Sequence, residues 1–275
     1  MTSDGPLLER IALALERLVP AERAATDWLA APAYVWDGSA ARAVERLEAP
    51  ALALLRGVEQ QKQAVVDNVL RHAAGHAAHD MLLWGSRGMG KSALIRSAIR
   101  GAQEESAGAI ALVQVAPDAL SGLSALFGEL GKVSRRFIVY IDDLGFEDGD
   151  STGPRQLRSW LEGGVEARPD NVRIAVTANR RAIVSRHMSE QDDPINPRDV
   201  VDDRLALADR FGLSIGFHNC SQDDYLDIIR GYAEALGLSF EDGDALEWSK
   251  RRGARSGRVA WHYVTELAGR AGRPL

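Results

Sequence analysis

The sequence predicts an α/β fold, in which a parallel β-sheet carries helices on both faces and is followed by a small helical domain. Three observations indicate it. Between residues 51 and 218, short apolar segments alternate with helical stretches, as strands joined by crossover helices do. A glycine-rich loop at residues 85–92 stands between one of these apolar segments and a helix. After residue 218 only helical spacing remains.

The composition is typical of a soluble globular protein. Of 275 residues, 45% are hydrophobic and 26% are charged, and no apolar run approaches the ~20 residues that a bilayer span needs. The N-terminal residues lack the basic and apolar regions of a signal peptide, so we expect a cytoplasmic location and no membrane partner. The single cysteine, Cys220, excludes an internal disulfide and a cysteine-based zinc site.

We expect residues 1–50 to form a helical N-terminal region. Four apolar residues recur at helical spacing ahead of Pro20, namely Leu8, Ile11, Leu15 and Leu18. An alanine-rich segment follows and leads to Tyr34-Val35-Trp36. The sequence gives no indication of what this region does.

Residues 51–218 are expected to form the α/β core. Five continuous apolar runs in it have the length of buried strands, and helical stretches separate them. The runs lie near residues 81–84, 109–115, 137–141, 172–177 and 213–217. This pattern predicts a parallel sheet that is covered on both faces.

Residues 219–275 are expected to form a small helical domain. Ser221 and Asp224 have the spacing of a capping box, which opens an amphipathic helix that ends at Gly237. Two more helical segments follow, around residues 244–252 and 256–268.

The glycine-rich loop is a complete phosphate-binding motif, G-x-x-x-x-G-K-[ST]. Its members are Gly85, Ser86, Arg87, Gly88, Met89, Gly90, Lys91 and Ser92. The glycines let backbone N–H groups surround a phosphate at the start of a helix, where the helix dipole adds positive charge. Lys91 is expected to reach the β- and γ-phosphates of ATP, and the Ser92 hydroxyl is expected to be a ligand of Mg²⁺.

Two carboxylates follow the apolar run at residues 137–141. In proteins with this loop, an aspartate at a strand end holds the magnesium shell, and an adjacent acid can orient or deprotonate the attacking water. We assign the first role to Asp142, as a metal-binding residue, and the second to Asp143. The alternative for Asp143 is a purely local role in opening an acidic turn.

An amide follows the next apolar run. Asn179 would be able to hydrogen-bond both the γ-phosphate and the attacking water if its strand lies between the loop strand and the Asp142 strand. On its own, an asparagine at a strand end is usually a turn residue.

The order of these elements closely resembles that of the AAA+ ATPases. The resemblance identifies residues 85–92 as Walker A, residues 138–143 as Walker B and Asn179 as sensor 1. It also identifies Arg210 as an arginine finger and Arg258 as sensor 2. Within that superfamily, the chain closely resembles an uncharacterised group of ATP-binding proteins, catalogued as a domain of unknown function. That closer resemblance rests on residues 34–36, 82–88, 142–144, 168–172, 179–181, 209–213 and 255–260.

The resemblance implies a five-stranded P-loop core, a C-terminal helical lid and ATP between them. It also places residues 55–58, with Gly57, near the adenine. It implies a homo-oligomer, a hexameric ring with ATP by analogy, in which Arg210 acts on the neighbouring subunit's nucleotide. The competing role for Arg210 is an intrachain salt bridge to Asp209 or Asp203. One departure is that Walker B ends in Asp-Asp where most members have Asp-Glu, so hydrolysis is expected to be slow.

These observations favour an ATPase that couples Mg·ATP binding and hydrolysis to a conformational change in an unidentified protein client. The alternative is a nucleotide-gated scaffold with negligible hydrolysis. A small-molecule kinase is disfavoured, because it would leave Asn179, Arg210 and the helical domain without a role. Nucleic acid is also disfavoured as a partner, since the net charge is −6 and a solvated helix face explains most of the basic stretch at residues 250–258.

Overall fold

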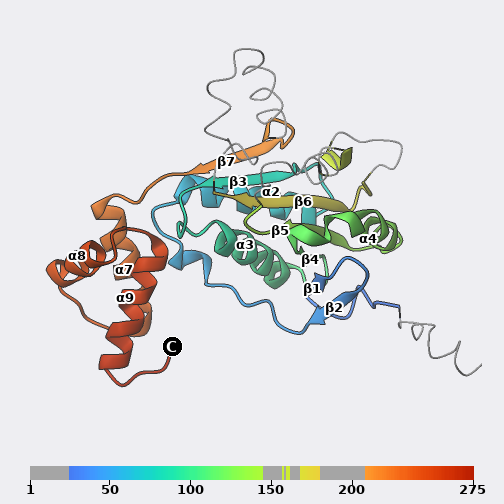
Figure 1. The fold of residues 1–275 in the computed structure, drawn as a ribbon. Helices are drawn as coiled ribbons and strands as arrows, with labels where there is room; N and C mark the ends of the chain where they lie inside the picture. The colour runs from blue at the N-terminus through green and yellow to red at the C-terminus, as the bar shows by residue number, and fades with distance from the viewer. Residues whose placement is uncertain (1–24, 145–156, 158, 162–167, 180–207) are drawn as a thin grey trace, which may run out of the picture.

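A mostly parallel β-sheet runs through the part of the chain that the computed structural model describes, which is residues 25–144, 157, 159–161, 168–179 and 208–275 (Figure 1). Within those residues the sheet has seven strands, and three helices pack together to one side of it. The strands are β1 (Ala33–Trp36), β2 (Ala41–Val44), β3 (Met81–Gly85), β4 (Ile110–Val115), β5 (Arg136–Ile141), β6 (Val172–Ala178) and β7 (Leu213–Phe217).

The strand order brings the chemically important strand ends together. The order is β2-β1-β4-β5-β6-β3-β7, and every neighbouring pair is parallel except β1 with β2. All five strands predicted from apolar runs are confirmed. Since β6 lies between β5 and β3, the carboxyl ends that precede Asp142, Asn179 and the glycine-rich loop lie side by side.

The prediction of a helical region over residues 1–50 is wrong for residues 33–44. These residues form β1 and β2, and β1 extends the sheet beside β4, so the sheet has two more strands than the five expected. The physical reason is the run Ala33–Trp36, in which the large rings of Tyr34 and Trp36 are each 1% exposed. The expected helix over residues 8–18 lies outside the described residues.

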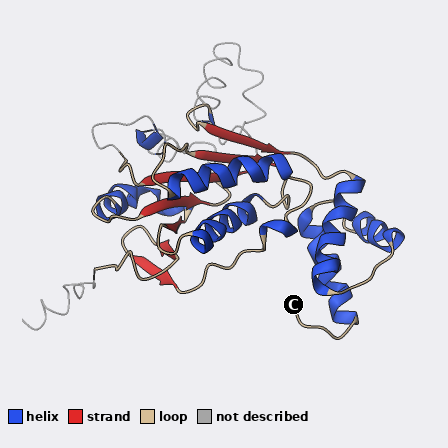
Figure 2. Ribbon diagram, turned by 180° about the vertical axis from the view of Figure 1, so that it is seen from behind, coloured by secondary structure: helices blue, strands red, loops and turns tan. Residues whose placement is uncertain are grey.

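Helices cover both faces of the sheet, as the continuous apolar runs predicted (Figures 1 and 2). Successive strand residues point to opposite faces, so Leu83 joins one buried cluster and Leu82 the other. The first cluster includes side chains of α2 (Glu59–Ala73) and α3 (Lys91–Glu105). The second includes side chains of α4 (Leu123–Leu130). The short 3-10 helices η1 (Leu52–Leu54) and η2 (Pro117–Gly122) lie in the connections.

The C-terminal residues form α7 (Gln222–Leu236), α8 (Asp242–Arg251) and α9 (Gly257–Arg270). The predicted capping box is present at the start of α7, where Ser221 and Asp224 bond reciprocally, and Gly237 ends the helix with φ +61°. None of the helices in the described part of the chain combines the length and the apolar character of a membrane span.

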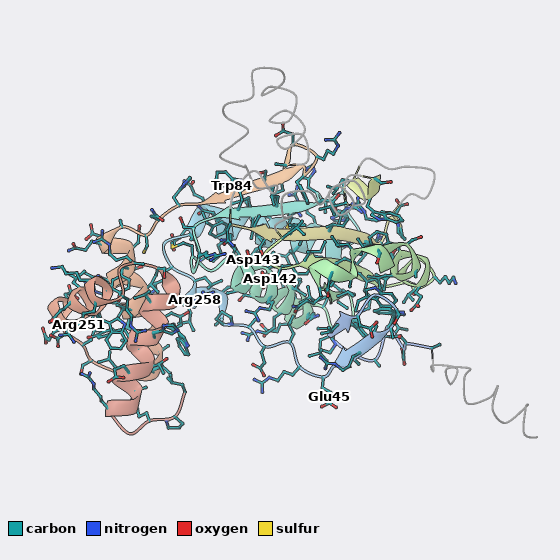
Figure 3. All side chains as sticks on the ribbon, in the orientation of Figure 1. Glu45, Trp84, Asp142, Asp143, Arg251 and Arg258 are labelled. Atoms are coloured by element: carbon teal, nitrogen blue, oxygen red, sulfur yellow. The ribbon has the colours of Figure 1, made fainter. Side chains whose placement is uncertain are left out.

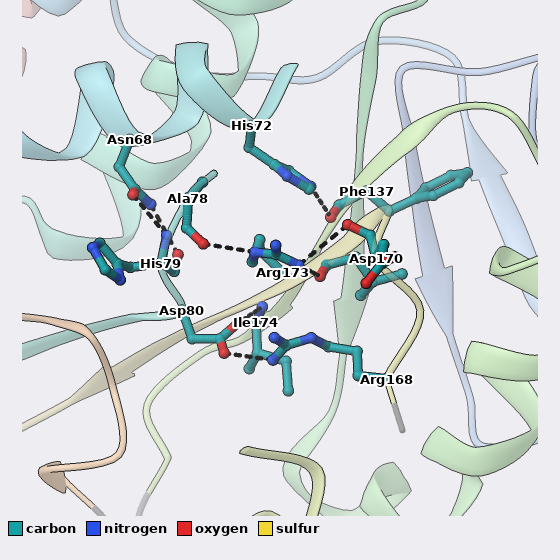
Figure 4. Close-up of polar contacts among 11 residues, drawn as sticks. Asn68, His72, Ala78, His79, Asp80, Phe137, Arg168, Asp170, Arg173 and Ile174 are labelled. Atoms are coloured by element: carbon teal, nitrogen blue, oxygen red, sulfur yellow. Dashed lines mark hydrogen bonds and ion pairs between the residues drawn. The ribbon is translucent and has the colours of Figure 1, made fainter. Parts of the chain in front are cut away.

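A buried polar network joins the strands at their amino ends, opposite the glycine-rich loop (Figure 4). Asp80, just before β3, accepts hydrogen bonds from the Ile174 amide at 2.7 Å and from Arg168 Nη1 at 2.5 Å. Arg173 of β6 donates through Nε to the Ala78 carbonyl at 2.8 Å. These bonds satisfy groups that would be costly to bury unpaired, and they fix β6 against β3.

His72 of α2 makes the stability of the chain pH-dependent. Its ring is 1% exposed, and Nε2 donates to the Phe137 carbonyl at 3.1 Å. Burial, helped by the nearby guanidinium groups of Arg173 and Arg136, lowers the pKa of His72 to about 4. The unfolded chain takes up this proton first, near pH 6.5. His72 therefore contributes stability above that pH that is lost as the pH falls towards 4, by up to roughly 3 kcal/mol.

Urea denaturation between pH 7 and pH 4 checks this expectation. His72→Gln keeps an N–H donor but does not titrate, so its unfolding free energy should fall less steeply with acid than that of the wild type. Identical pH profiles for the two proteins would show that His72 does not carry the effect.

Candidate nucleotide-binding site

The glycine-rich loop between β3 and α3 has a backbone that requires its glycines. Gly85 has φ +119°, and a Cβ there would lie 2.1 Å from the Phe217 carbonyl oxygen, so β7 leaves no room for a side chain. Gly88 and Gly90 also have positive φ, of +75° and +86°. Gly90 precedes α3, and no side chain caps the first N–H groups of that helix. The loop therefore offers free backbone donors at a helix N-terminus.

Lys91, the first residue of α3, lies beneath the loop. The residue is 7% exposed, and Nζ donates to the carbonyls of Gly85 at 2.8 Å and Ser86 at 2.9 Å. Burial lowers the pKa of Lys91, and the carboxylates of Asp143 and Asp142 oppose that shift. The ammonium is thus held by two carbonyls of the loop, close to two negative charges.

Asp142 collects three hydroxyl groups on one carboxylate oxygen. Oδ1 accepts from Ser92 at 2.7 Å, from Thr177 at 2.6 Å and from Tyr140 at 2.5 Å. Burial by itself raises the pKa of Asp142, but the three hydroxyls and the charge of Arg96 outweigh it, and the pKa is lowered. Asp142 is therefore an oriented carboxylate that stays ionised.

Asp143 has an unusual backbone for a residue other than glycine, with φ +50°. Two contacts hold it there: its amide donates to Thr177 Oγ1 at 2.8 Å, and its carboxylate accepts a short hydrogen bond from Asn179 Nδ2. The Asn179 side chain thus lies beside Asp143, as the strand order requires. Strained backbone of this kind is common where a side chain must be aimed at a ligand.

Arg258 brings the C-terminal helices to the loop. Its backbone N–H, in the first turn of α9, donates to the Gly88 carbonyl at 3.0 Å. A Cβ on Gly88 would approach the Ser256 hydroxyl to 2.9 Å, so the contact is close. Figure 3 shows Arg258 on the side of the C-terminal helices that faces Asp142 and Asp143.

A cavity of about 600 Å³ joins these groups. One wall consists of residues 87–93 and 96 with Asp142, Asp143, Thr177 and Asn179. The opposite wall consists of residues from the segment before α2, from α7 and from α9: Leu54, Leu55, Arg56, Val58, Ile228, Tyr232, Gly257, Arg258 and Trp261. A volume of this size suits a small-molecule ligand.

Four residues predicted for the site do not line the cavity. Gly85 and Ser86 lie behind Lys91 and accept its hydrogen bonds. Gly57 is absent from the wall although residues 54–56 and 58 contribute to it. Arg210 lies outside the cavity, in the turn before β7.

Sequence reasoning missed several residues of the cavity and its support. Tyr140 and Thr177 each stand two residues before a predicted site residue in a strand, so the strand period of two was a usable signal. Tyr232 and Trp261 gave no such signal. Their rings lie 5.0 Å apart between centroids only because α7 packs against α9.

Known structures share this architecture. The RuvB Holliday junction branch migration motor of Thermotoga maritima aligns with a TM-score of 0.55 and 16% identity, over 82% of this chain and 68% of its own. Aeropyrum pernix Orc1, solved in complex with DNA, aligns with a TM-score of 0.56 and 14% identity, over 83% of this chain and 66% of its own. Aeropyrum pernix Orc2 aligns with a TM-score of 0.53 and 16% identity, over 79% of this chain and 64% of its own.

The fold is that of the AAA+ ATPases, as the order of the motifs predicted. A family described as "Protein of unknown function (DUF815)" matches residues 29–271, and the chain belongs to this family. No curated protein matches the sequence.

The conformation of the loop predicts that Gly85→Ala is strongly destabilising. The new methyl group would collide with the Phe217 carbonyl, which belongs to the sheet and cannot move aside. We expect a loss of about 3 kcal/mol or more in the free energy of unfolding. Gly108→Ala is the matched control, since Gly108 has φ +79° but no atom within 4 Å, and it should cost about 1 kcal/mol. Equal losses in urea denaturation would show that the close approach to β7 is unimportant.

Proposed function

We propose that this protein binds Mg·ATP in the cavity beside Lys91 and hydrolyses it to drive a conformational change in another macromolecule. The observation that carries the proposal is the hydrogen bond from the Ser92 hydroxyl to the Asp142 carboxylate, 2.7 Å long, at the cavity wall. In P-loop NTPases, a hydroxyl and an acid in this arrangement hold the metal ion that accompanies the phosphates.

The charges around the cavity suit a triphosphate. Lys91, Arg87 and Arg258 line it together with the uncapped start of α3, and all of these favour anions. Lys91 would exchange its two neutral carbonyl partners for phosphate oxygens, whose negative charge makes hydrogen bonds from an ammonium stronger. The apolar side chains on the opposite wall, those of Leu54, Leu55, Val58, Ile228 and Tyr232, would contact the base and ribose.

The residues present also fit magnesium. Mg²⁺ binds through oxygen atoms, often through one or two protein groups together with phosphates and water. Ser92 and Asp142 supply such groups. Within the described residues, no three His, Cys, Asp or Glu side chains form a cluster that would indicate another metal. When bound, the ion would supply positive charge that neutralises phosphate oxygens.

Asp143 and Asn179 are the proposed catalytic pair. Both line the cavity, and their mutual hydrogen bond places an amide donor and a carboxylate acceptor at one point. The carboxylate would orient a water molecule and accept its proton, while the amide would bind the γ-phosphate. Arg258, on the other wall, would stabilise the charge that develops on the phosphate.

Two observations favour a second candidate, a nucleotide-gated switch with negligible hydrolysis. The Asp143 carboxylate is already engaged by Asn179, and the aspartate side chain is one methylene shorter than the glutamate that most AAA+ proteins carry there. Both features would reduce the ability of the Asp143 carboxylate to activate water. Turnover therefore decides between the two candidates.

We propose a protein client and self-assembly. RuvB is a Holliday junction branch migration motor and Orc1 was solved in complex with DNA, but here the side chains of the basic stretch at residues 250–258 are largely engaged within the chain. Arg251 pairs with Glu247, Arg252 stacks over the Trp248 ring at 4.8 Å, and Arg258 lines the cavity. Arg210 stands outside its own cavity, which suits a role as a cation supplied to the next subunit of a ring.

Lys91→Ala is expected to weaken ATP binding by roughly tenfold or more, because it removes the buried cation of the loop. Titration with a fluorescent ATP analogue measures the Kd. Lys132→Ala, at an exposed position away from the cavity, is the control and should bind as the wild type does. A folded Lys91→Ala protein with unchanged affinity would make the loop a structural turn and refute the proposed function.

Asp143→Asn is expected to keep nucleotide affinity but to abolish phosphate release, since the amide preserves shape and loses the charge that activates water.

In the same phosphate-release assay, turnover per wild-type subunit should rise with protein concentration, and turnover of Arg210→Ala should not. If saturating Mg·ATP gives no wild-type turnover at any concentration, the switch replaces the ATPase. If Arg210→Ala is fully active, Arg210 does not act across subunits.

A further inference from the structure

Arg56 joins the α/β core to the C-terminal helices through two ion pairs. It lies in the segment between η1 and α2. Its Nη1 bonds to Asp227 Oδ1 at 3.2 Å, and its Nη2 bonds to Glu234 Oε2 at 2.9 Å. Both carboxylates belong to α7, so one guanidinium spans two turns of the helix.

Gly231 lets Arg56 lie across α7. It stands between the two carboxylates, four residues after Asp227 and three before Glu234. A Cβ at Gly231 would lie 2.6 Å from Arg56 Nε and 3.0 Å from Cζ, so any larger residue would displace the side chain. Glycine is among the poorest helix formers, and its place in the middle of α7 therefore has a packing reason.

The segment that carries Arg56 is fixed to the core on its other side. Leu55 and Val58 are buried, and the Leu55 carbonyl accepts a hydrogen bond from Lys62 Nζ of α2 at 2.8 Å. On the partner side, Ile228 and Tyr232 of α7 line the cavity. The position of α7 relative to Arg56 therefore sets the width of the apolar end of the cavity.

We propose that Arg56 and Gly231 form a latch that holds the C-terminal helices against the core and so sets nucleotide affinity. Arg56 is a positioning residue in this arrangement, and the effect on affinity rests on the proposed function. The side chains of Arg56, Asp227 and Glu234 are 29%, 49% and 68% exposed, so water and salt reach the ion pairs. The latch is therefore one that opens at moderate cost and weakens at high ionic strength.

A double-mutant cycle separates the latch from direct contact between Arg56 and the ligand, since Arg56 also lines the cavity. The variants are Arg56→Gln, the pair Asp227→Asn with Glu234→Gln, and all three together. The carboxylates do not line the cavity, so they make no contact with a nucleotide bound there. If the latch operates, each variant weakens binding of the fluorescent ATP analogue roughly three- to tenfold, and the triple variant falls no further.

Gly231→Ala provides an independent test. Alanine favours the helix but excludes the guanidinium, so α7 should remain intact by circular dichroism while affinity falls as it does for Arg56→Gln. Asp242→Asn is the matched control. It removes the Arg230–Asp242 pair, which is similarly exposed but lies within the C-terminal helices, and affinity should stay within about twofold of the wild type.

Limited thermolysin digestion without nucleotide tests the latch apart from the proposed function. Residues 219–275 should be released faster from Arg56→Gln and Gly231→Ala than from the wild type, and wild-type release should accelerate with salt. Equal digestion rates in all three proteins would overturn the latch, as would additive losses of affinity in the cycle. If the wild type binds no nucleotide while the digestion rates differ as expected, the proposed function fails and the latch stands.

Discussion

The site depends on one carboxylate oxygen. Asp142 Oδ1 accepts hydrogen bonds from three hydroxyl groups, those of Ser92 in α3, Tyr140 in β5 and Thr177 in β6. Each hydroxyl comes from a separate element, so the bonds act as a clamp that fixes the loop helix against two strands. Thr177 also accepts a hydrogen bond from the Asp143 amide, so the same threonine fixes the backbone of the residue after Asp142. A half-buried carboxylate that accepts these three hydrogen bonds can stay both ionised and oriented.

The clamp works because of the strand order. Parallel strands end at one edge of the sheet, and the position of β6 between β5 and β3 puts three strand ends within reach of one another. At the amino ends of the strands, Asp80 and Arg173 hold β6 and β3 in register through hydrogen bonds to the backbone. At the carboxyl ends, the strands are held by side chains that face the cavity. The two ends of the strands are therefore fixed by different chemistry.

Local patterns predicted much of this architecture. The five strands, the strand-loop-helix context of the glycine-rich loop and the capping box at Ser221 all depend on neighbours in sequence, and all are present where expected. The first strands were missed because an alanine-rich neighbourhood concealed a strand of only four residues beginning at Ala33. Tyr232, Trp261 and the partners of Arg56 depend on contacts between distant segments, which no local pattern contains.

The bond from the Arg258 amide to the Gly88 carbonyl connects the helical domain to the loop through main chain alone. The bond involves no atom of the Arg258 side chain, so the link between α9 and the loop is independent of the charge at position 258. Rotation of the C-terminal helices would therefore pull on the loop backbone directly. The backbone contact and the side-chain charge of Arg258 can consequently be altered separately over evolution.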